Sequence, residues 1–437
     1  MEKIPAVKYM RDFYPEDMRL RLWIEDHWRR ASLRAGFQEW DAPIMEYLEL
    51  YARKSGDEIV GQLFTIAPRE AEGKDDKLKA IRPEMTPSLA RMIAARQAAL
   101  PKPIKWFCIA RMCRSERGQR GRLREFWQWN ADVLGSDDPT ADAEVIAVAV
   151  DALSSMGLTQ DEVEVRINSR TLSSAILRAI GVSDPQQPAV YAALDKRGKI
   201  PAEALRELFT KAGLDAATIE KVERSLDCSS LEAFDEFARG HNLRGHEAPL
   251  ADLREVFQSL AALGAAEWCR YDPGVVRGLA YYTGPVFEIF DKKANLRALA
   301  GGGRYDNLLS VVGGQPMSAV GFGMGDVVLG ELLSDLKKLP SNEMQLDDYV
   351  IPLEDERKVD VLKLVAQLRS AGRRADFAPT AGNLGKLMKR ADQLGASRVV
   401  LVGGQEWQAG KLKVKDMKNR TETEVPLADF FSRRPGV

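Results

Sequence analysis

Residues 111–135 constrain the fold more than any other stretch, because they place an arginine-rich turn between two β-strand patterns. The first strand should enter near Trp106 and the second should leave near Phe126. Successive side chains of a strand point to opposite faces. The second strand therefore has a polar face and an apolar face. The polar row comprises Arg122, Arg124, Phe126, Gln128, Asn130 and Asp132, and the apolar row comprises Leu123, Trp127, Trp129 and Val133.

Arg114 and Glu116 lie on the incoming strand and face the same way as the polar row if the hairpin pairs in register. A guanidinium group binds two phosphate oxygens at once, and the ring of Phe126 offers a flat face for a base. The hairpin therefore predicts a nucleotide-binding floor. A solvated charged hairpin is the alternative, and it is favoured for an arbitrary arginine-rich turn. Here the polar residues persist over six alternate positions, which favours the binding site.

The composition limits the possible functions. A chain of 437 residues is long enough for two or three domains, and 45% hydrophobic with 29% charged residues is typical of soluble globular proteins. The formal net charge is −1, so contacts with nucleic acid must come from local basic patches. The N-terminus lacks an apolar run of signal-peptide length and no later segment approaches a membrane span, so we expect a cytoplasmic protein without a membrane partner.

Cysteine and histidine offer little chemistry in this chain. No second pair completes a zinc set around the cysteines, so we expect reduced thiols, mostly in the core, at Cys108, Cys113, Cys228 and Cys269. The histidines have no metal-ligand or nucleophile spacing, so neither histidine-based catalysis nor metal hydrolysis is expected of His27, His241 and His246.

The segment KAIRPEMTPSLARMIAAR predicts a strand, a turn at Pro83 and a helix that starts near Pro87, with Thr86 as its N-cap. Glu84 and Thr86 lie two residues apart at the end of this strand. A carboxylate and a hydroxyl at this spacing can hold an ammonium group together. Helix capping is the alternative, and it accounts for Thr86 but not for Glu84.

A second candidate surface is the strand SAVGFGMG, in which Gly321, Gly323 and Gly325 alternate. One face of this strand has no side chains, so a flat ligand such as adenosine can lie against it. Close strand packing is the alternative. The chain has no GxxxxGK[ST] loop, and the spacing is not GxGxxG in a βαβ unit, which argues against a P-loop and a dinucleotide-binding fold.

The rest of the chain divides by its periodicity. Residues 183–262 show apolar side chains at helical spacing, and residues 336–348 form a linker. From residue 349 strands alternate with helices, which predicts a parallel sheet. Residues 411–427 then predict a hairpin with a turn near Asn419, before a last helix. Lys386, Lys389 and Arg390 form a basic stripe on one of these helices, suited to phosphate or to solvent.

Together these motifs resemble those of class II aminoacyl-tRNA synthetases, and most closely the histidyl-tRNA synthetases. RSERGQRGRLREFWQWNADVLG resembles motif 2, RPEMT the turn that binds the amino group, and RGLAYYTG the signature of the histidyl branch. SAVGFGMGDVVLGELL resembles motif 3, and the helix and strand at 17–47 resemble the dimer-forming motif 1. The resemblance covers nearly all of the chain.

The resemblance implies a mixed α/β fold. Residues 1–182 and 263–335 would form an α+β catalytic domain with an antiparallel sheet and flanking helices. Residues 183–262 would be a helical insertion that reaches the tRNA acceptor stem. Residues 349–437, after the 336–348 linker, would form an α/β anticodon-binding domain.

The implied activity is that of a homodimer that converts histidine and ATP to histidyl-adenylate and pyrophosphate, with Mg²⁺ screening the triphosphate, and then transfers the histidyl group to the 3′ end of tRNA(His). No protein side chain is assigned to a metal. Arg277 and Arg114 would be the catalytic residues. Histidine would be bound by Glu84, Met85, Thr86, Gln128, Asp132, Tyr281 and Tyr282. ATP would be bound by Arg114, Glu116, Arg122, Phe126, Gly323 and Gly325.

The chain departs from the family pattern at two positions. Val328 stands where motif 3 usually has an arginine that contacts the γ-phosphate, so Arg304 or a magnesium ion would have to supply that charge. Ala280 stands where most members have aspartate, which affects a contact behind the substrate.

Two other functions fit part of the pattern. A histidine-sensing regulatory subunit of ATP phosphoribosyltransferase is a non-catalytic relative, and Val328 favours it. That family normally lacks the C-terminal domain, whereas this chain has the domain, the RGLAYY segment and the motif 2 arginines, which favours the enzyme. A tRNA-binding module without catalysis would keep the C-terminal domain but lose the convergent polar pocket.

Overall fold

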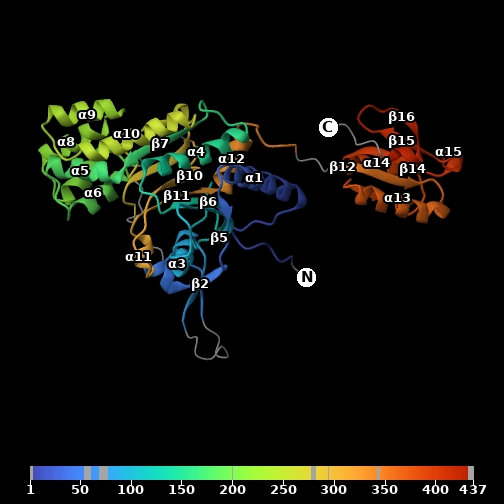
Figure 1. Ribbon diagram of the computed structural model, residues 1–437, viewed down its shortest axis with the longest axis horizontal. Helices are drawn as coiled ribbons and strands as arrows, with labels where there is room; N and C mark the ends of the chain where they lie inside the picture. Colours follow the sequence, from blue (N-terminus) through green and yellow to red (C-terminus); the bar gives the residue numbers. More distant parts are fainter. Residues whose placement is uncertain are drawn as a thin grey trace. The chain divides into compact units, whose positions relative to one another are not determined.

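The computed structural model describes residues 3–53, 61–67, 77–198, 200–276, 282–293, 295–341 and 345–431. The chain has two compact units (Figure 1). The first comprises Leu20–Pro340 with Met1–Phe13, and the second comprises Ser341–Val437 with Tyr14–Arg19. The expected mixed α/β fold is confirmed.

The first unit is built on an eight-stranded sheet in the order β1-β5-β6-β11-β10-β9-β7-β8. The pairs from β5 to β7 are antiparallel, and the two edge strands β1 and β8 pair in parallel with their neighbours. The strands are β1 (Gln38–Glu39), β5 (Ile104–Cys113), β6 (Glu125–Leu134), β7 (Val163–Ser169), β8 (Cys269–Tyr271), β9 (Pro285–Asp291), β10 (Ala300–Arg304) and β11 (Ala319–Gly325).

The arginine-rich hairpin forms as predicted from β5 and β6, but β6 begins only at Glu125. Arg122 and Arg124 therefore precede the strand, although the backbone N–H of Arg114 still donates to the carbonyl of Arg124 (2.8 Å). The pairing keeps Arg114 on the same face as Gln128 and Asp132. The polar row predicted from alternation is thus continuous across the turn.

Strand β11 brings the glycine row against the polar row. Its register places Gly321 opposite Asp132, Gly323 opposite Asn130 and Gly325 opposite Gln128. Directly opposed residues point to the same face of a sheet. The two surfaces that the sequence predicted separately are therefore one surface.

The opposite face of the sheet is the core. Trp129 and Phe322 lie in edge-to-face contact there with ring centroids 4.7 Å apart, and the indole N–H of Trp129 donates to Ser32 (3.0 Å). The helices that share this apolar cluster or flank it are α1 (Pro15–Arg34), α4 (Pro139–Ser155), α10 (Glu247–Ala262) and α12 (Asp326–Asp335).

Helices also fill most of residues 170–240. They are α5 (Arg170–Ile180), α6 (Gln187–Leu194), α7 (Ala202–Lys211), α8 (Ala216–Leu226) and α9 (Leu231–Gly240). Ser169, Asp215 and Ser230 cap α5, α8 and α9 by accepting backbone N–H groups. The buried side chains of this segment join the same apolar cluster as the sheet. In Figure 1 these helices lie together at the β7 side of the unit.

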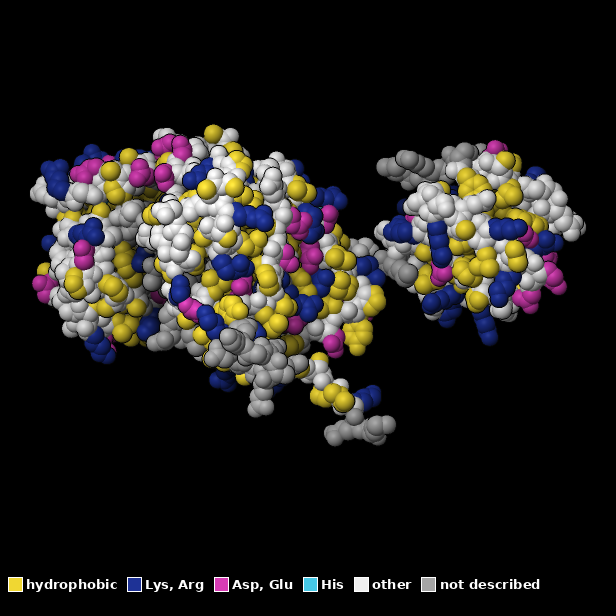
Figure 2. Space-filling model, turned by 60° about the horizontal axis from the view of Figure 1, so that its bottom comes forward, with side chains coloured by type: hydrophobic (Ala, Val, Ile, Leu, Met, Phe, Trp, Pro, Cys, Tyr) yellow, Lys and Arg dark blue, Asp and Glu magenta, His cyan; other side chains and the backbone are white. Residues whose placement is uncertain are grey.

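A small sheet in the order β2-β4-β3 precedes the hairpin and leads into α3 (Thr86–Arg96). Its strands are β2 (Met45–Tyr47), β3 (Thr65–Ile66) and β4 (Lys79–Ile81). Several of its large apolar side chains are exposed, at Ile44, Met45, Tyr47, Ile66 and Leu78. Figure 2, with this end of the first unit turned forward, shows apolar, basic and acidic side chains intermixed. This agrees with the near-zero net charge.

The second unit has a five-stranded sheet in the order β13-β12-β14-β15-β16. The predicted alternation of strands and helices is confirmed, and the first strand begins slightly earlier than expected. The elements are β12 (Leu346–Pro352), α13 (Lys358–Ser370), β13 (Ala375–Phe377), α14 (Leu384–Gln393), β14 (Ala396–Val402), α15 (Gly404–Gln408), β15 (Lys411–Asp416), β16 (Glu422–Pro426) and α16 (Leu427–Phe430). Among the described helices, none is long and apolar enough to cross a bilayer.

Candidate active site

The glycines of β10 and β11 make room for side chains of neighbouring strands. A Cβ atom on Gly321 would lie 2.6 Å from Cγ of Asp132, and one on Gly323 would lie 2.9 Å from Cδ of Gln128. A Cβ on Gly303, which pairs with Gly321, would lie 3.0 Å from the ring of Tyr282. We call Gly303, Gly321 and Gly323 the glycine floor. Because only glycine leaves this space, the floor fixes where these three side chains lie.

Asp132 and Tyr282 therefore lie next to two paired positions of the glycine floor, Gly321 and Gly303. Both are nearly buried, at 3% and 7% exposure. The carboxylate of Asp132 accepts a 2.5 Å hydrogen bond from the hydroxyl of Tyr305. A hydroxyl donating to a carboxylate at this distance is a strong, charge-assisted bond, so it fixes the orientation of Asp132.

Glu84 and Thr86 lie at the start of α3, and both are half-buried. The prediction that Thr86 caps the helix is wrong. The cap position is Met85, whose backbone is already helical and whose side chain makes no capping bond. Thr86 is the first residue of the helix and Pro87 the second. Capping therefore does not explain the Thr86 hydroxyl.

Met85, which the resemblance implies as a histidine-binding residue, lies between Glu84 and Thr86 in this turn. Its side chain is fully buried and packs in an apolar cluster with Leu89 and Ile93 of α3. An unbranched apolar side chain fills core space well. The Met85 side chain therefore anchors the turn to the core and does not line its surface.

Arg114 is held at the start of the arginine-rich turn. Its Nε donates to the carbonyl of Pro83 (2.9 Å), and its guanidinium lies over the ring of Phe126, 5.0 Å from the centroid. The first contact ties Arg114 to the turn that carries Glu84. The contact with Phe126 stacks the guanidinium of Arg114 on the ring, so a bound base would share the surface of Phe126 with Arg114.

Glu116 and Arg122 pair with each other and line an open cavity of about 590 Å³. Its other lining residues are Gln62, Ser115, Arg117, Gly118 and Gln119. Burial lowers the pKa of the Arg122 guanidinium, and the positive charges of Arg297 and Arg114 lower it further. The cavity is therefore a place where positive charge is concentrated, and it suits a multiply charged anion.

The hairpin turn is docked on both sides. Tyr9 lies against Gly118, where a Cβ atom would be 2.7 Å from Cε1 of the tyrosine, and the Tyr9 carbonyl accepts from the N–H of Arg124 (3.0 Å). On the other side the N–H of Gly121 donates to Glu331 of α12 (3.1 Å). The turn is thus positioned by contacts from distant parts of the chain.

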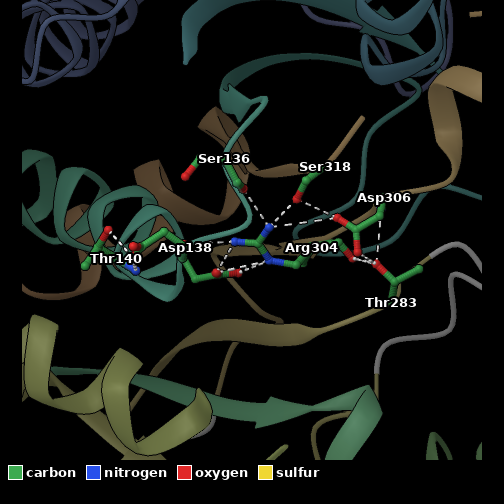
Figure 3. Close-up of polar contacts among 8 residues, drawn as sticks. Ser136, Asp138, Thr140, Thr283, Arg304, Asp306 and Ser318 are labelled. Atoms are coloured by element: carbon green, nitrogen blue, oxygen red, sulfur yellow. Dashed lines mark hydrogen bonds and ion pairs between the residues drawn. The ribbon is translucent and has the colours of Figure 1, made fainter. Parts of the chain in front are cut away.

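Arg304 does not supply the charge that is missing at Val328, contrary to the expectation from sequence. Its guanidinium has five N–H groups, and each has an acceptor (Figure 3). Nε and Nη2 donate to Asp142, Nη1 donates to Ser318 and to the carbonyl of Ser136, and Nη2 also donates to the carbonyl of Asp138. Arg304 follows Gly303 on β10, so it points to the opposite face of the sheet.

Arg277, Ala280 and Tyr281 lie outside the described residues. The turn before them is well anchored, because the side-chain amide of the buried Asn168 donates to the carbonyls of Pro273 (3.1 Å) and Val275 (3.0 Å). The turn therefore leads into residues 277–281 from a fixed position.

No group of three or more His, Cys, Asp or Glu side chains among the described residues is arranged to hold a metal ion. The four cysteines are free thiols, three of them buried.

The chain matches known proteins in sequence over nearly its whole length. The sequence model of histidyl-tRNA synthetase matches residues 9–325, and that of an anticodon-binding domain matches residues 348–433. A histidine–tRNA ligase from Opitutus terrae is 39% identical over 99% of this chain and 100% of its own length. The chain belongs to the histidyl-tRNA synthetase family.

Other members of the histidyl-tRNA synthetase family agree with this result. The chloroplastic and mitochondrial histidine–tRNA ligase of Arabidopsis thaliana is 37% identical over 97% of this chain and 85% of its own length. The crystal structure of histidyl-tRNA synthetase from Nostoc sp. PCC 7120 superposes with a TM-score of 0.85 over 99% of both chains, at 23% identity. The latter supports the fold.

Sequence reasoning missed two residues of the site. Tyr305 is one of them, because its bond to Asp132 joins strands that are far apart in the sequence. Glu288 of β9 lies opposite Gly301, which lies opposite Gly323, so its side chain points to the face of the glycine floor. The alternation in PVFEIFD was the available signal for Glu288.

Proposed function

We propose that this protein is a histidine–tRNA ligase. ATP and histidine would form histidyl-adenylate and pyrophosphate, and the histidyl group would then pass to the 3′ end of tRNA(His). Family membership supports the reaction class. The single observation that carries the choice of amino acid is the placement of Asp132 and Tyr282 beside the paired glycines Gly321 and Gly303.

Histidine would be selected by an acid and a phenol. In the proposal, Asp132 accepts from one ring nitrogen and Tyr282 bonds the other, while Tyr305 holds Asp132 in place. An amino acid without both nitrogens would leave buried polar groups unpaired, which costs about 1–3 kcal/mol each. Glu84, Thr86 and Gln128 would hold the ammonium and carboxylate groups.

ATP would bind along the arginine-rich hairpin. Arg114 would contact the α-phosphate, Phe126 and Glu116 the adenine, and Arg122 the outer phosphates. No Cβ on Gly325 would meet a protein atom within 4 Å, which leaves room for the adenosine there. The magnesium ion would arrive as part of MgATP, bound to the triphosphate and not to a resident protein site.

The reaction needs charge stabilisation more than proton transfer. The histidine carboxylate attacks the α-phosphorus, the bond to the bridging oxygen breaks, and pyrophosphate leaves with the electron pair. Negative charge builds up on the α-phosphate oxygens as the bond forms. Arg114 and Arg277 are proposed to offset it, and preorganised donors of this kind lower such barriers by several kcal/mol.

The second unit would bind the anticodon arm of the tRNA. Lys386, Lys389 and Arg390 are exposed on α14 and give it a basic stripe. The exposed apolar side chains of the small sheet, Met45, Tyr47 and Ile66 among them, support the homodimer that motif 1 implies. A cytoplasmic location completes the proposal.

An aminoacylation assay with histidine, ATP and tRNA(His) tests the proposal. The expected result is histidine-dependent exchange of pyrophosphate into ATP and formation of histidyl-tRNA. Binding of histidine without either reaction would instead support the regulatory subunit of ATP phosphoribosyltransferase. Binding of tRNA alone would support a module without catalysis.

A further inference from the structure

Arg297 lies in the turn between β9 and β10, and the turn holds it firmly. The carboxylate of Asp291, which is only 4% exposed, accepts the backbone N–H groups of Asn295 (3.1 Å) and Leu296 (3.2 Å). Two residues after Arg297, the Leu299 carbonyl accepts from the N–H of Gly325 (3.4 Å). Arg297 is therefore fixed beside the point where β11 passes into α12.

The arginine-rich hairpin reaches the same point from the other side. A Cβ atom on Gly121 would lie 3.3 Å from Cγ2 of Val328, in the first turn of α12. Arg122 follows Gly121 directly. The side chain that replaces the usual motif 3 arginine thus packs against the turn that carries Arg122.

Arg114, Arg122 and Arg297 form one cluster of positive charge, which we call the arginine cluster. The charges of Arg297 and Arg114 lower the pKa of Arg122, and charges act in this way only over short distances. Glu116 pairs with Arg122. No carboxylate in the described ranges forms an ion pair with Arg297, whose side chain is exposed.

Three like charges held together by fixed backbone repel each other, and this repulsion is relieved when an anion binds between them. A solvated surface arginine is the simpler explanation for an exposed residue in a turn. It does not account for the contact between Leu299 and Gly325, which holds this turn at the start of α12 next to the hairpin. Since the resemblance implies a γ-phosphate contact at the motif 3 position, which Val328 occupies, the anion that suits this cluster is the polyphosphate end of ATP.

We propose that Arg297 binds the outer phosphates of ATP and supplies the positive charge that Val328 lacks. This inference rests on the proposed function, because it assigns Arg297 to the nucleotide of that reaction. It also agrees with the position of Arg304, which cannot supply this charge because its donors are all used on the other face of the sheet.

The test measures nucleotide affinity in the full-length protein. Arg297→Ala should raise the KM for ATP in histidine-dependent pyrophosphate exchange by about 10- to 100-fold, the worth of a charge-assisted contact. The affinity for AMP, which lacks the outer phosphates, and the KM for histidine should not change. Arg297→Lys should recover part of the loss. Lys293→Ala removes a charge from the same turn and should behave as the wild type.

The outcomes separate this inference from the function on which it rests. If the wild-type protein catalyses no histidine-dependent exchange, the proposed function fails. If the wild type is active and Arg297→Ala keeps its KM for ATP, Arg297 does not bind ATP. If only the KM for tRNA rises, the residue contacts tRNA and the inference is overturned. Equal losses for ATP and AMP would also overturn it, because they would indicate a distorted site.

Discussion

The substitution Gly321→Ala tests whether the glycine floor positions the histidine-binding residues. The backbone of Gly321 lies in a regular strand, so alanine fits its conformation and the effect is purely steric. A Cβ atom would lie 2.6 Å from Cγ of Asp132, whereas ordinary contact begins at 3.4 Å. The Asp132 carboxylate must therefore move by about 0.8 Å or more, a distance obtained by subtracting the two values.

A shift of this size breaks the 2.5 Å bond between Tyr305 and Asp132 and moves the acceptor that we propose for histidine. Loss of a hydrogen bond to a buried charged group costs about 1.5–3 kcal/mol. We expect the KM for histidine to rise by about 10- to 100-fold, while the KM for ATP changes little. Steady-state pyrophosphate exchange at varied histidine and at varied ATP measures both quantities.

Gly325→Ala is the matched control for histidine binding, since it lies on the same face of β11 and no protein atom lies within 4 Å of its Cβ position. It should leave the KM for histidine unchanged. A wild-type KM for histidine in Gly321→Ala would refute the reasoning, because Asp132 would then not need the space that the glycine leaves. Equal effects of both variants would refute it too.

Three further perturbations test other parts of the structure. Gly118→Ala should push Tyr9 off the hairpin and speed hydrogen exchange at the Arg124 amide, because the Cβ would lie 2.7 Å from Cε1 of Tyr9; unchanged exchange would contradict this. Arg304→Met should destabilise the protein by about 3–5 kcal/mol in chemical denaturation but spare the KM for ATP, since it removes one partner of a buried ion pair behind the sheet; a raised KM for ATP would place Arg304 in the site. Burial raises the pKa of Asp348 to about 6, so the folded state binds a proton between pH 4 and 6 that the unfolded chain releases. Relative to Asp348→Asn, the wild type should therefore become more stable by about 1 kcal/mol when the pH is lowered from 7 to 5. The same stability is lost when the pH is raised through 6. Parallel pH profiles of the two proteins would contradict this.

Local patterns predicted the parts of the site that one hairpin contains. Strand alternation placed Arg114, Gln128 and Asp132 on one face, and the β5–β6 register confirmed it, because a hairpin links neighbouring residues in sequence. The period-two glycines predicted a face without side chains. What lies over that face is mostly protein, since Asp132 and Gln128 cover Gly321 and Gly323.

The errors came from features that sequence neighbours do not determine. Thr86 was assigned as a helix cap from residue type, but Met85 already has helical dihedral angles of φ −102° and ψ −23°, so the helix starts one residue earlier. Arg304 was one of two candidates, with a magnesium ion, for the charge missing at Val328, and only its charge suggested it. The register of β10 with β11 shows which face of the sheet the Arg304 side chain occupies, because it pairs Gly303 with Gly321 and Arg304 with Val320.

The start of α12 explains how the chain tolerates valine at the motif 3 position. Asp326 is 5% exposed and is held by Arg11 (2.6 Å) and by the backbone N–H of Trp127 (3.0 Å). A carboxylate in the first turn of a helix is stabilised by the helix dipole, and Arg11 neutralises it from outside the site. An additional arginine at Val328 would crowd Gly121 and add its charge next to Arg122. A cation carried by the β9–β10 turn, as proposed for Arg297, would avoid that crowding and would keep three positive charges near the hairpin without the motif 3 arginine.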